Sequence, residues 1–220
     1  MNNVVNTIEF GNKHAIPKLS ILILTIPNRA AKLKRLVSFL IKQCKGLENE
    51  VEIVTTFDRK QIRIGEKRNI ALRASRGNYV TFIDDDDFIS DDYVYEILSV
   101  LQYGPDCVGF KVKCEMKDIM GKVTEKSNAI ISNRYDDWYH DGFEKIGDDL
   151  FKYRQFIYHK SPVRREIALQ VGFKDMVMGE DYEYALRLKP LLKHERFINK
   201  YLYYYDFQKE PGGPNKRYAK

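Results

Sequence analysis

The sequence has few cysteines, little proline and no long apolar run. Its three cysteines, Cys44, Cys107 and Cys114, are an odd number and lack the close spacing of a metal-binding motif, which argues against a disulfide framework. The longest apolar run, residues 19–26, is too short to span a membrane. The first 18 residues lack the apolar stretch of a signal peptide. We therefore expect reduced thiols and a cytoplasmic protein.

The charge of the chain changes sign along its length. Residues 1–80 carry a net charge of +9, residues 81–150 of −10, and residues 151–220 of +7. A nucleic-acid-binding protein more often shows one basic face without an acidic centre. The pattern instead favours a metal site that receives a phosphorylated substrate. The length of 220 residues and the hydrophobic content of 44% are typical of one globular domain.

An apolar segment, residues 79–83, stops at four consecutive acids: Asp84, Asp85, Asp86 and Asp87. Its β-branched and aromatic residues predict a buried strand. Because adjacent carboxylates repel one another, something must offset them. Hard oxygen ligands suit a divalent cation such as Mg²⁺, Mn²⁺ or Ca²⁺, and we expect Mn²⁺ or Mg²⁺ here. The alternative is a solvated acidic turn that begins the next helix.

Three strand patterns, at residues 19–25, 51–57 and 79–83, alternate with amphipathic helix patterns. This order predicts an α/β fold with parallel strands and right-handed crossovers. Ligands bind outside the carboxyl ends of the strands in such sheets. All three strand ends are polar and two of them are acidic, so we expect the site there.

The remainder of the chain shows other sequence patterns. We expect a loose lead-in over residues 1–18 and a mobile tail over residues 208–220. Between residue 105 and the tail the patterns first predict a hairpin (residues 106–132), a polar and aromatic loop (133–150) and a short strand (156–158). Two helices (162–170 and 179–188) and a Tyr-rich strand (197–207) are expected to follow.

The motifs, taken in order, resemble the family 2 inverting glycosyltransferases of the GT-A fold. They comprise a polar turn after the first strand, an acid that ends the second, an Arg-Asn pair on a helix, the acidic run, and a late Glu-Asp pair with an arginine six residues after the aspartate. The matching positions are Thr25, Pro27, Asn28, Arg29, Asp58, Arg68, Asn69, Asp84, Asp85, Asp86, Asp87, Glu180, Asp181 and Arg187.

The resemblance implies a Rossmann-like, mostly parallel sheet flanked by helices, with a small acceptor-side region at its C-terminal end. Residues 19–207 would form a single domain, with a nucleotide-binding half over residues 19–104 and an acceptor half over residues 105–207. The implied reaction moves a sugar from a nucleotide-diphosphate donor, with a UDP-sugar expected, to a hydroxyl of a glycan, lipid, protein or nucleic acid.

The resemblance also implies a role for each residue. Asp181 would be the general base, with Glu180 beside it, and Asp84, Asp86 and Asp87 would hold the metal. The donor would be bound by Thr25, Pro27, Asn28, Arg29, Asp58, Lys67, Arg68, Asn69, Asp84, Asp85 and Arg187.

Two departures and two alternatives stand beside this interpretation. The chain has Asp206 and Gln208 where many family members place a histidine, and its second strand ends in one acid rather than two. A nucleotidyltransferase is one alternative, although the loop at residues 26–29 lacks the glycines it needs. The other is a sugar- or nucleic-acid-binding module with an inactive site. His159 is expected to be a structural or surface group. The basic residues Lys160, Arg164 and Arg165 have two interpretations: phosphate binding near the site or, more simply, an exposed basic helix start.

Overall fold

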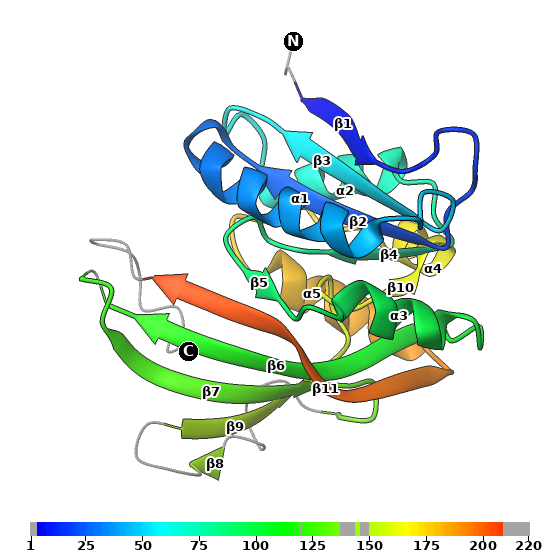
Figure 1. Ribbon diagram of the computed structural model, residues 1–220. Coiled ribbons are helices and arrows are strands. Elements are labelled where there is room, and N and C mark those ends of the chain that lie inside the picture. Colours follow the sequence, from blue (N-terminus) through cyan, green and yellow to red (C-terminus); the bar gives the residue numbers. More distant parts are fainter. Residues whose placement is uncertain (1–3, 119, 137–143, 146–149, 209–220) are drawn as a thin grey trace.

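The computed structural model describes residues 4–118, 120–136, 144–145 and 150–208 (Figure 1). An eleven-stranded mixed sheet runs through this part of the chain. Its strands are β1 (Val5–Phe10), β2 (Leu19–Thr25), β3 (Val51–Phe57), β4 (Tyr79–Phe82), β5 (Phe88–Ile89), β6 (Cys107–Lys117), β7 (Val123–Ile131), β8 (Glu144–Lys145), β9 (Leu150–Gln155), β10 (Val163–Arg164) and β11 (Glu195–Gln208).

The first half of the chain forms the predicted parallel unit. Strands β3, β2 and β4 lie side by side and parallel, because helical crossovers separate them in the sequence. Their near-continuous apolar residues are buried, as expected for strands covered on both faces. The helices are α1 (Ala30–Cys44), α2 (Ile64–Ala74), α3 (Tyr93–Leu101), α4 (Arg165–Val171) and α5 (Glu180–Leu188), with short 3-10 turns η1 (Pro27–Arg29) and η2 (Lys189–Leu191).

The expected loose lead-in is wrong over part of its length. Strand β1 pairs antiparallel with β3 and extends the sheet at this edge. Most β1 side chains are exposed, so the strand lacks the alternating apolar pattern that would have revealed it. Polar pairs fix its position instead: Thr55 Oγ1 donates to Glu9 and Thr56 Oγ1 to Asn6, at 2.8 and 2.7 Å.

The second half widens the sheet with strands of both directions. The predicted hairpin is confirmed as β6 and β7, and the Tyr-rich strand is confirmed as β11, which runs parallel to β6. Strand β10 joins the two halves by pairing antiparallel with both β4 and β6. The strand expected at residues 156–158 is wrong, because β9 ends just before it. Parallel pairing is therefore only part of this mixed sheet.

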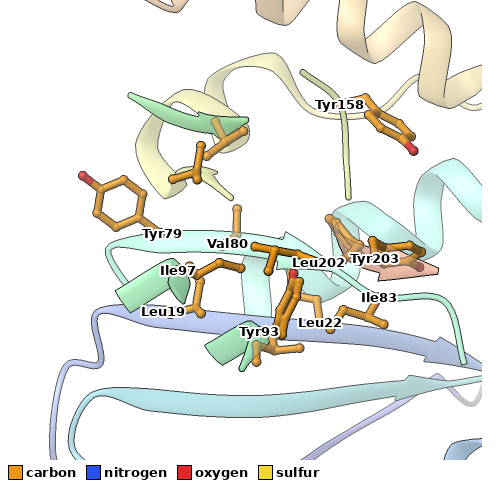
Figure 2. Close-up of a cluster of buried hydrophobic side chains, with 14 of the residues drawn as sticks. Leu19, Leu22, Tyr79, Val80, Ile83, Tyr93, Ile97, Tyr158, Leu202 and Tyr203 are labelled. Atoms are coloured by element: carbon orange, nitrogen blue, oxygen red, sulfur yellow. The ribbon is translucent and has the colours of Figure 1, made fainter. Parts of the chain in front are cut away.

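One apolar core contains residues from both halves of the chain. Tyr93 of α3 is fully buried beside Leu22, Ile83 and Tyr203, so residues from α3, β2, β11 and the end of β4 share one cluster (Figure 2). Rigid packing of this kind transmits position from one element to the next. The core thus fixes the segment after β4 relative to β11.

Parts of the predicted loop and tail lie outside the described residues. They comprise residues 137–143, 146–149 and 209–220, and Gln208 is the last residue of β11. In the described part of the chain, no helix combines the length and the apolar character needed to cross a bilayer.

Candidate active site

The carboxyl ends of β2, β3 and β4 meet at one edge of the sheet, as parallel pairing requires. Thr25 at the end of β2 donates from Oγ1 to Asp85 Oδ2 at 2.7 Å. Lys67 on α2 donates to the carbonyl of Thr25 and to the carboxylate of Asp58, which follows β3. Asp58 also accepts the backbone N–H of Gln61 at 2.7 Å. Three strand ends are therefore tied together by direct hydrogen bonds.

The four acids after β4 fall into two classes. Asp85 and Asp87 are buried, each with 1% of its surface exposed. The side chains of Asp84 and Asp86 keep 33% and 24% of their surface exposed. Alternate carboxylates thus face outward, and Asp84 and Asp86 are the two that a ligand can reach.

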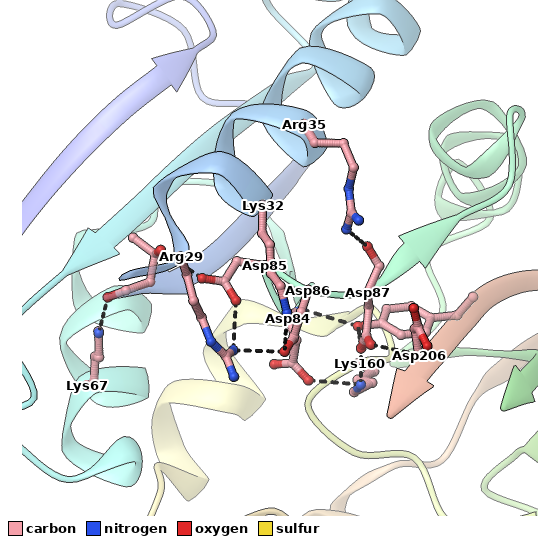
Figure 3. Close-up of polar contacts among 12 residues, drawn as sticks. Arg29, Lys32, Arg35, Lys67, Asp84, Asp85, Asp86, Asp87, Lys160 and Asp206 are labelled. Atoms are coloured by element: carbon pink, nitrogen blue, oxygen red, sulfur yellow. Dashed lines mark hydrogen bonds and ion pairs between the residues drawn. The ribbon is translucent and has the colours of Figure 1, made fainter. Parts of the chain in front are cut away.

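Cationic side chains from the protein itself lie around the acidic run (Figure 3). Arg29 lies 2.9 Å from Asp85 Oδ1 and 3.1 Å from Asp86 Oδ2, and Lys32 lies 3.8 Å from Asp86. The pKa of Arg29 is raised: burial opposes this, but Asp86 and Asp85 outweigh burial. Much of the repulsion within the run is therefore offset by built-in positive charge.

Lys160 also supplies positive charge to the acidic run, and its position differs from the one expected from the sequence. Its ammonium group lies 2.9 Å from Asp84 Oδ2 and 2.6 Å from Asp87 Oδ2. It also lies 4.4 Å from the ring centre of Tyr203 and 4.3 Å from that of Tyr205. Lys160 is buried, so its interpretation as part of an exposed helix start is wrong. The segment before β10 packs against β4 and carries Lys160 inward.

Asp87 is an anchor of the acidic run. Its Oδ2 accepts the hydroxyl of Tyr203 at 2.5 Å, and its Oδ1 accepts the backbone N–H of Asp206 at 3.2 Å. Both oxygens are therefore engaged, which does not suit the expected role of Asp87 as a metal ligand. Asp206 stands where the expected histidine would be, and here its backbone holds the acidic loop against β11.

Burial and Lys160 give Asp84 and Asp87 different pKa values. Burial raises the pKa of Asp87 to about 6, with repulsion from Asp84 in the same direction and Lys160 opposing. Burial also acts to raise the pKa of Asp84, but attraction to Lys160, His159 and Arg68 holds that pKa well below its usual range. Of these two carboxylates, the outward-facing Asp84 is thus the one that stays ionised more readily.

The second acidic pair begins α5, as predicted. Glu180 is buried and its Oε1 accepts Arg68 Nη1 at 2.5 Å. Nη2 of the same arginine lies 3.2 Å from His159 Nε2, beside Lys160 in the chain. Burial and Arg68 lower the pKa of His159 well below its ordinary value. Asp181 is partly exposed and its Oδ1 accepts the N–H of Tyr182 at 2.8 Å.

Several predicted donor ligands have structural contacts instead. Asn69 bonds the backbone of Phe173 through both ends of its amide. Arg187 pairs with Glu183 and donates to the carbonyls of Val171 and Gly172. These contacts hold α5 against α4 and α2, which places Glu180 and Asp181.

Two further donor predictions concern the turn after β2. The side chains of Pro27 and Asn28 in η1 are exposed. This turn ends at Arg29, whose side chain pairs with Asp85 and Asp86 of the acidic run.

The fit of a metal ion depends on Asp84 and Asp86. Within the described residues no group of three or more histidine, cysteine or acidic side chains is arranged to hold a metal. Asp84 and Asp86 each have one oxygen in an ion pair, and their Oδ1 atoms have no partner among the described residues. Two such carboxylates suit Mg²⁺ or Mn²⁺, which take their other ligands from water and substrate phosphates.

Comparison with known sequences identifies the family. A sequence profile of glycosyl transferase family 2 matches residues 53–170, more than half of the chain. The chain belongs to glycosyl transferase family 2. The matched region includes most of β3, the acidic run after β4, and Lys160. No curated protein sequence matches the chain.

Solved structures support the same fold. This family 2 chain is similar to the crystal structure of S. aureus TarS 1-349, with a TM-score of 0.54 and 13% identity. The same fragment in complex with UDP-GlcNAc gives a TM-score of 0.55 at 13% identity, over 88% of this chain and 60% of that chain. The structure in complex with UDP gives 0.54, again at 13% identity, over 86% and 60%. The α/β fold expected of a GT-A glycosyltransferase is confirmed, and the chain spans 60% of the length of the TarS fragments.

Proposed function

We propose that the protein transfers a sugar from a nucleotide-diphosphate donor, a UDP-sugar, to an acceptor hydroxyl with inversion of the anomeric centre. Family membership supports glycosyl transfer, and similar TarS structures are complexes with UDP and UDP-GlcNAc. The observation that carries the proposal is a polar network. Asp84 pairs with Lys160, whose neighbour along the chain, His159, contacts Arg68, and Arg68 in turn pairs with Glu180 beside Asp181.

The donor half of the site corresponds to residues 19–104. Thr25 and Asp58 lie at the two strand ends where the nucleoside would bind, with Lys67 holding Asp58 in place. Arg29 and Lys32 are the cations nearest the outward carboxylate of Asp86. In this proposal Arg29 and Lys32 attract the diphosphate when the donor binds, and their attraction to the acidic run weakens. A Mn²⁺ or Mg²⁺ ion held by Asp84 and Asp86 would supply Lewis-acid stabilisation of the leaving diphosphate.

The acceptor half is organised by α5. Arg68 holds Glu180 by an ion pair of two nearly buried side chains, which fixes the first turn of the helix. Asp181 Oδ2 has no partner within the described residues and is free to accept the proton of an acceptor hydroxyl. The deprotonated oxygen attacks the anomeric carbon from the face opposite the leaving group, through an oxocarbenium-like transition state. Attack from that face inverts the centre.

Release of UDP from a panel of UDP-sugars tests this function. Water can take the place of the acceptor, so the acceptor need not be known. The wild-type protein is expected to release UDP, and Asp181→Asn to release it about 10²–10⁴-fold more slowly. Asp91→Asn is the matched control, because Asp91 is an exposed acid whose loss changes the charge equally. Release of pyrophosphate instead of UDP would contradict glycosyl transfer and favour a nucleotidyltransferase.

A further inference from the structure

Strands β6 and β11 have a second face that is turned away from the described helices (Figure 1). Val112 and Cys114 of β6 point into the core, whereas Lys111 and Lys113 alternate with them and lie on the other face. Tyr201 of β11 pairs with Lys111 across the strands, so the same face carries both residues. We call the surface formed by Lys111, Lys113, Arg134, Phe197, Tyr201 and Tyr204 the outer sheet face.

Cations on the outer sheet face lie over aromatic rings. The ammonium groups of Lys111 and Lys113 lie 5.6 and 4.9 Å from the centre of the Tyr201 ring. Lys113 also lies 5.8 Å from the ring centre of Tyr204. Such contacts hold a long cationic side chain against the sheet and lower the entropy that it loses when it binds an anion.

The charge of the two lysines on this face is not paired within the described residues, whereas Arg134 lies beside Glu195. Lys111 and Lys113 form no ion pair there, while the acid beside them on β6, Glu115, is paired with Lys126 at 3.1 Å. Glu195 is nearly buried, accepts the hydroxyl of Ser132 and lies 3.7 Å from Arg134 Nε. The face therefore presents ammonium groups that attract anions from solution.

A pocket of about 250 Å³ opens on the same face. Its lining includes Lys111, Arg134, Ser132, Asn199, Tyr135 and Phe197, and no carboxylate lines it. It is smaller than the roughly 300–1,000 Å³ of sites for drug-sized molecules. An unpaired lysine, an arginine beside Glu195, a hydroxyl and an amide around aromatic side chains suit one small anionic sugar unit.

We propose that the outer sheet face binds an acidic polysaccharide and anchors it as the acceptor chain; this substrate class rests on the proposed glycosyl transfer. Lys111 and Lys113 are two residues apart on one strand, about 7 Å, which suits repeating anions on an extended chain. Single-stranded nucleic acid fits less well, because its bases stack on open ring faces. Here Tyr201 and Tyr204 have ammonium groups over their rings.

The outer sheet face is separate from the reaction centre. Tyr203 points to the other side of the sheet, where its hydroxyl contacts Asp87. Polysaccharide binding can therefore be measured without donor, and a failure of the proposed glycosyl transfer leaves the binding result interpretable. In the reverse case, UDP release is measured without polysaccharide.

The test is the affinity of the full chain for polygalacturonate, measured by calorimetry at several salt concentrations. We expect salt-dependent binding that is at least tenfold weaker in the Lys111→Gln/Lys113→Gln variant, with a shallower salt dependence. The matched control is Lys34→Gln/Lys42→Gln, which removes two exposed charges from α1 and is expected to leave affinity unchanged. Neutral dextran is expected not to bind.

Four outcomes would overturn the proposal. They are an absence of binding by the wild-type chain, equal weakening in both double variants, equal binding of dextran, and tighter binding of oligo-deoxythymidine than of polygalacturonate. Thermal unfolding of each variant establishes that it is folded before its affinity is compared.

Discussion

The ammonium group of Lys160 lies 2.6 Å from the carboxylate of Asp87, and both groups are buried. Loss of one partner of such a pair leaves a buried charge without compensation, which costs about 3–5 kcal/mol. We therefore expect Lys160→Met to lower the free energy of unfolding by this amount in a urea titration. The Lys160→Met/Asp87→Asn double variant is expected to recover part of the loss, because neither charge then remains unpaired. A loss below about 1 kcal/mol in the single variant would contradict this role.

Asp106 should make stability depend on pH. Its carboxylate accepts the N–H groups of Lys193 and His194 at 2.8 and 2.9 Å and lies 3.1 Å from Arg164 Nε. Burial opposes the effect, but these donors lower the pKa of Asp106 below its ordinary value. A depressed folded-state pKa stabilises the protein above the unfolded value of about 3.9, and that stability is lost as pH falls through the folded pKa.

The measurement for Asp106 compares unfolding free energies across pH. At neutral pH we expect Asp106→Asn to cost about 1.5–3 kcal/mol, the range for hydrogen bonds to a charged group. The difference from wild type should shrink below about pH 4, where Asp106 becomes protonated in the unfolded chain, and should vanish once it is protonated in the folded protein as well. Asp91→Asn is again the control, and a difference that stays constant from pH 3 to pH 7 would refute the linkage.

The three cysteines should resist thiol reagents in the folded protein. All three are buried, and none is in a disulfide. Burial raises the pKa of Cys44 to about 12, with Glu48 adding to the effect, and burial with Glu195 raises the pKa of Cys107. Because the thiolate is the reactive form, we expect negligible labelling by a disulfide reagent at pH 8 and three thiols per chain after denaturation. Rapid labelling of any thiol in the native state would contradict this burial.

Much of the donor half could be predicted from the sequence, for a physical reason. Strands β2, β3 and β4 carry unbroken apolar runs, and parallel pairing alone brings their ends, and hence Asp58 and Asp84, to one edge. Helix α5 was predictable because Gly179 and the acids after it mark a helix start. Local pattern and tertiary structure agree at these positions.

The parts that sequence reasoning missed depend on contacts between distant segments. The role of Lys160 follows from the packing of the chain before β10 against β4, and residues 160 and 87 lie 73 positions apart. No local pattern distinguishes such a lysine from an exposed one. Strand β1 was missed because it is an edge strand with mostly exposed side chains. Lys67 was predicted to bind the donor, but its side chain turns inward to Asp58, and both residues are buried.

The Arg68–Glu180 pair should affect turnover more than donor affinity. It joins α2 to the first turn of α5 at 2.5 Å and sits beside the proposed base Asp181. We expect Glu180→Gln to lower kcat for UDP release at least tenfold while the apparent affinity for the donor changes little. Glu66→Gln, which removes a surface partner of Arg73, is the control on α2. An equal loss of affinity and turnover would place Glu180 in donor binding instead.

The central claim is that the acids after β4 receive a nucleotide diphosphate. Its most direct test is a titration of UDP with and without Mn²⁺, followed by the shift in thermal unfolding, since a ligand that binds only the folded state raises apparent stability. We expect UDP with Mn²⁺ to stabilise the wild-type protein and Asp91→Asn equally, and to have little effect on Asp86→Asn. Stabilisation of Asp86→Asn equal to that of wild type, or none in wild type, would contradict the claim.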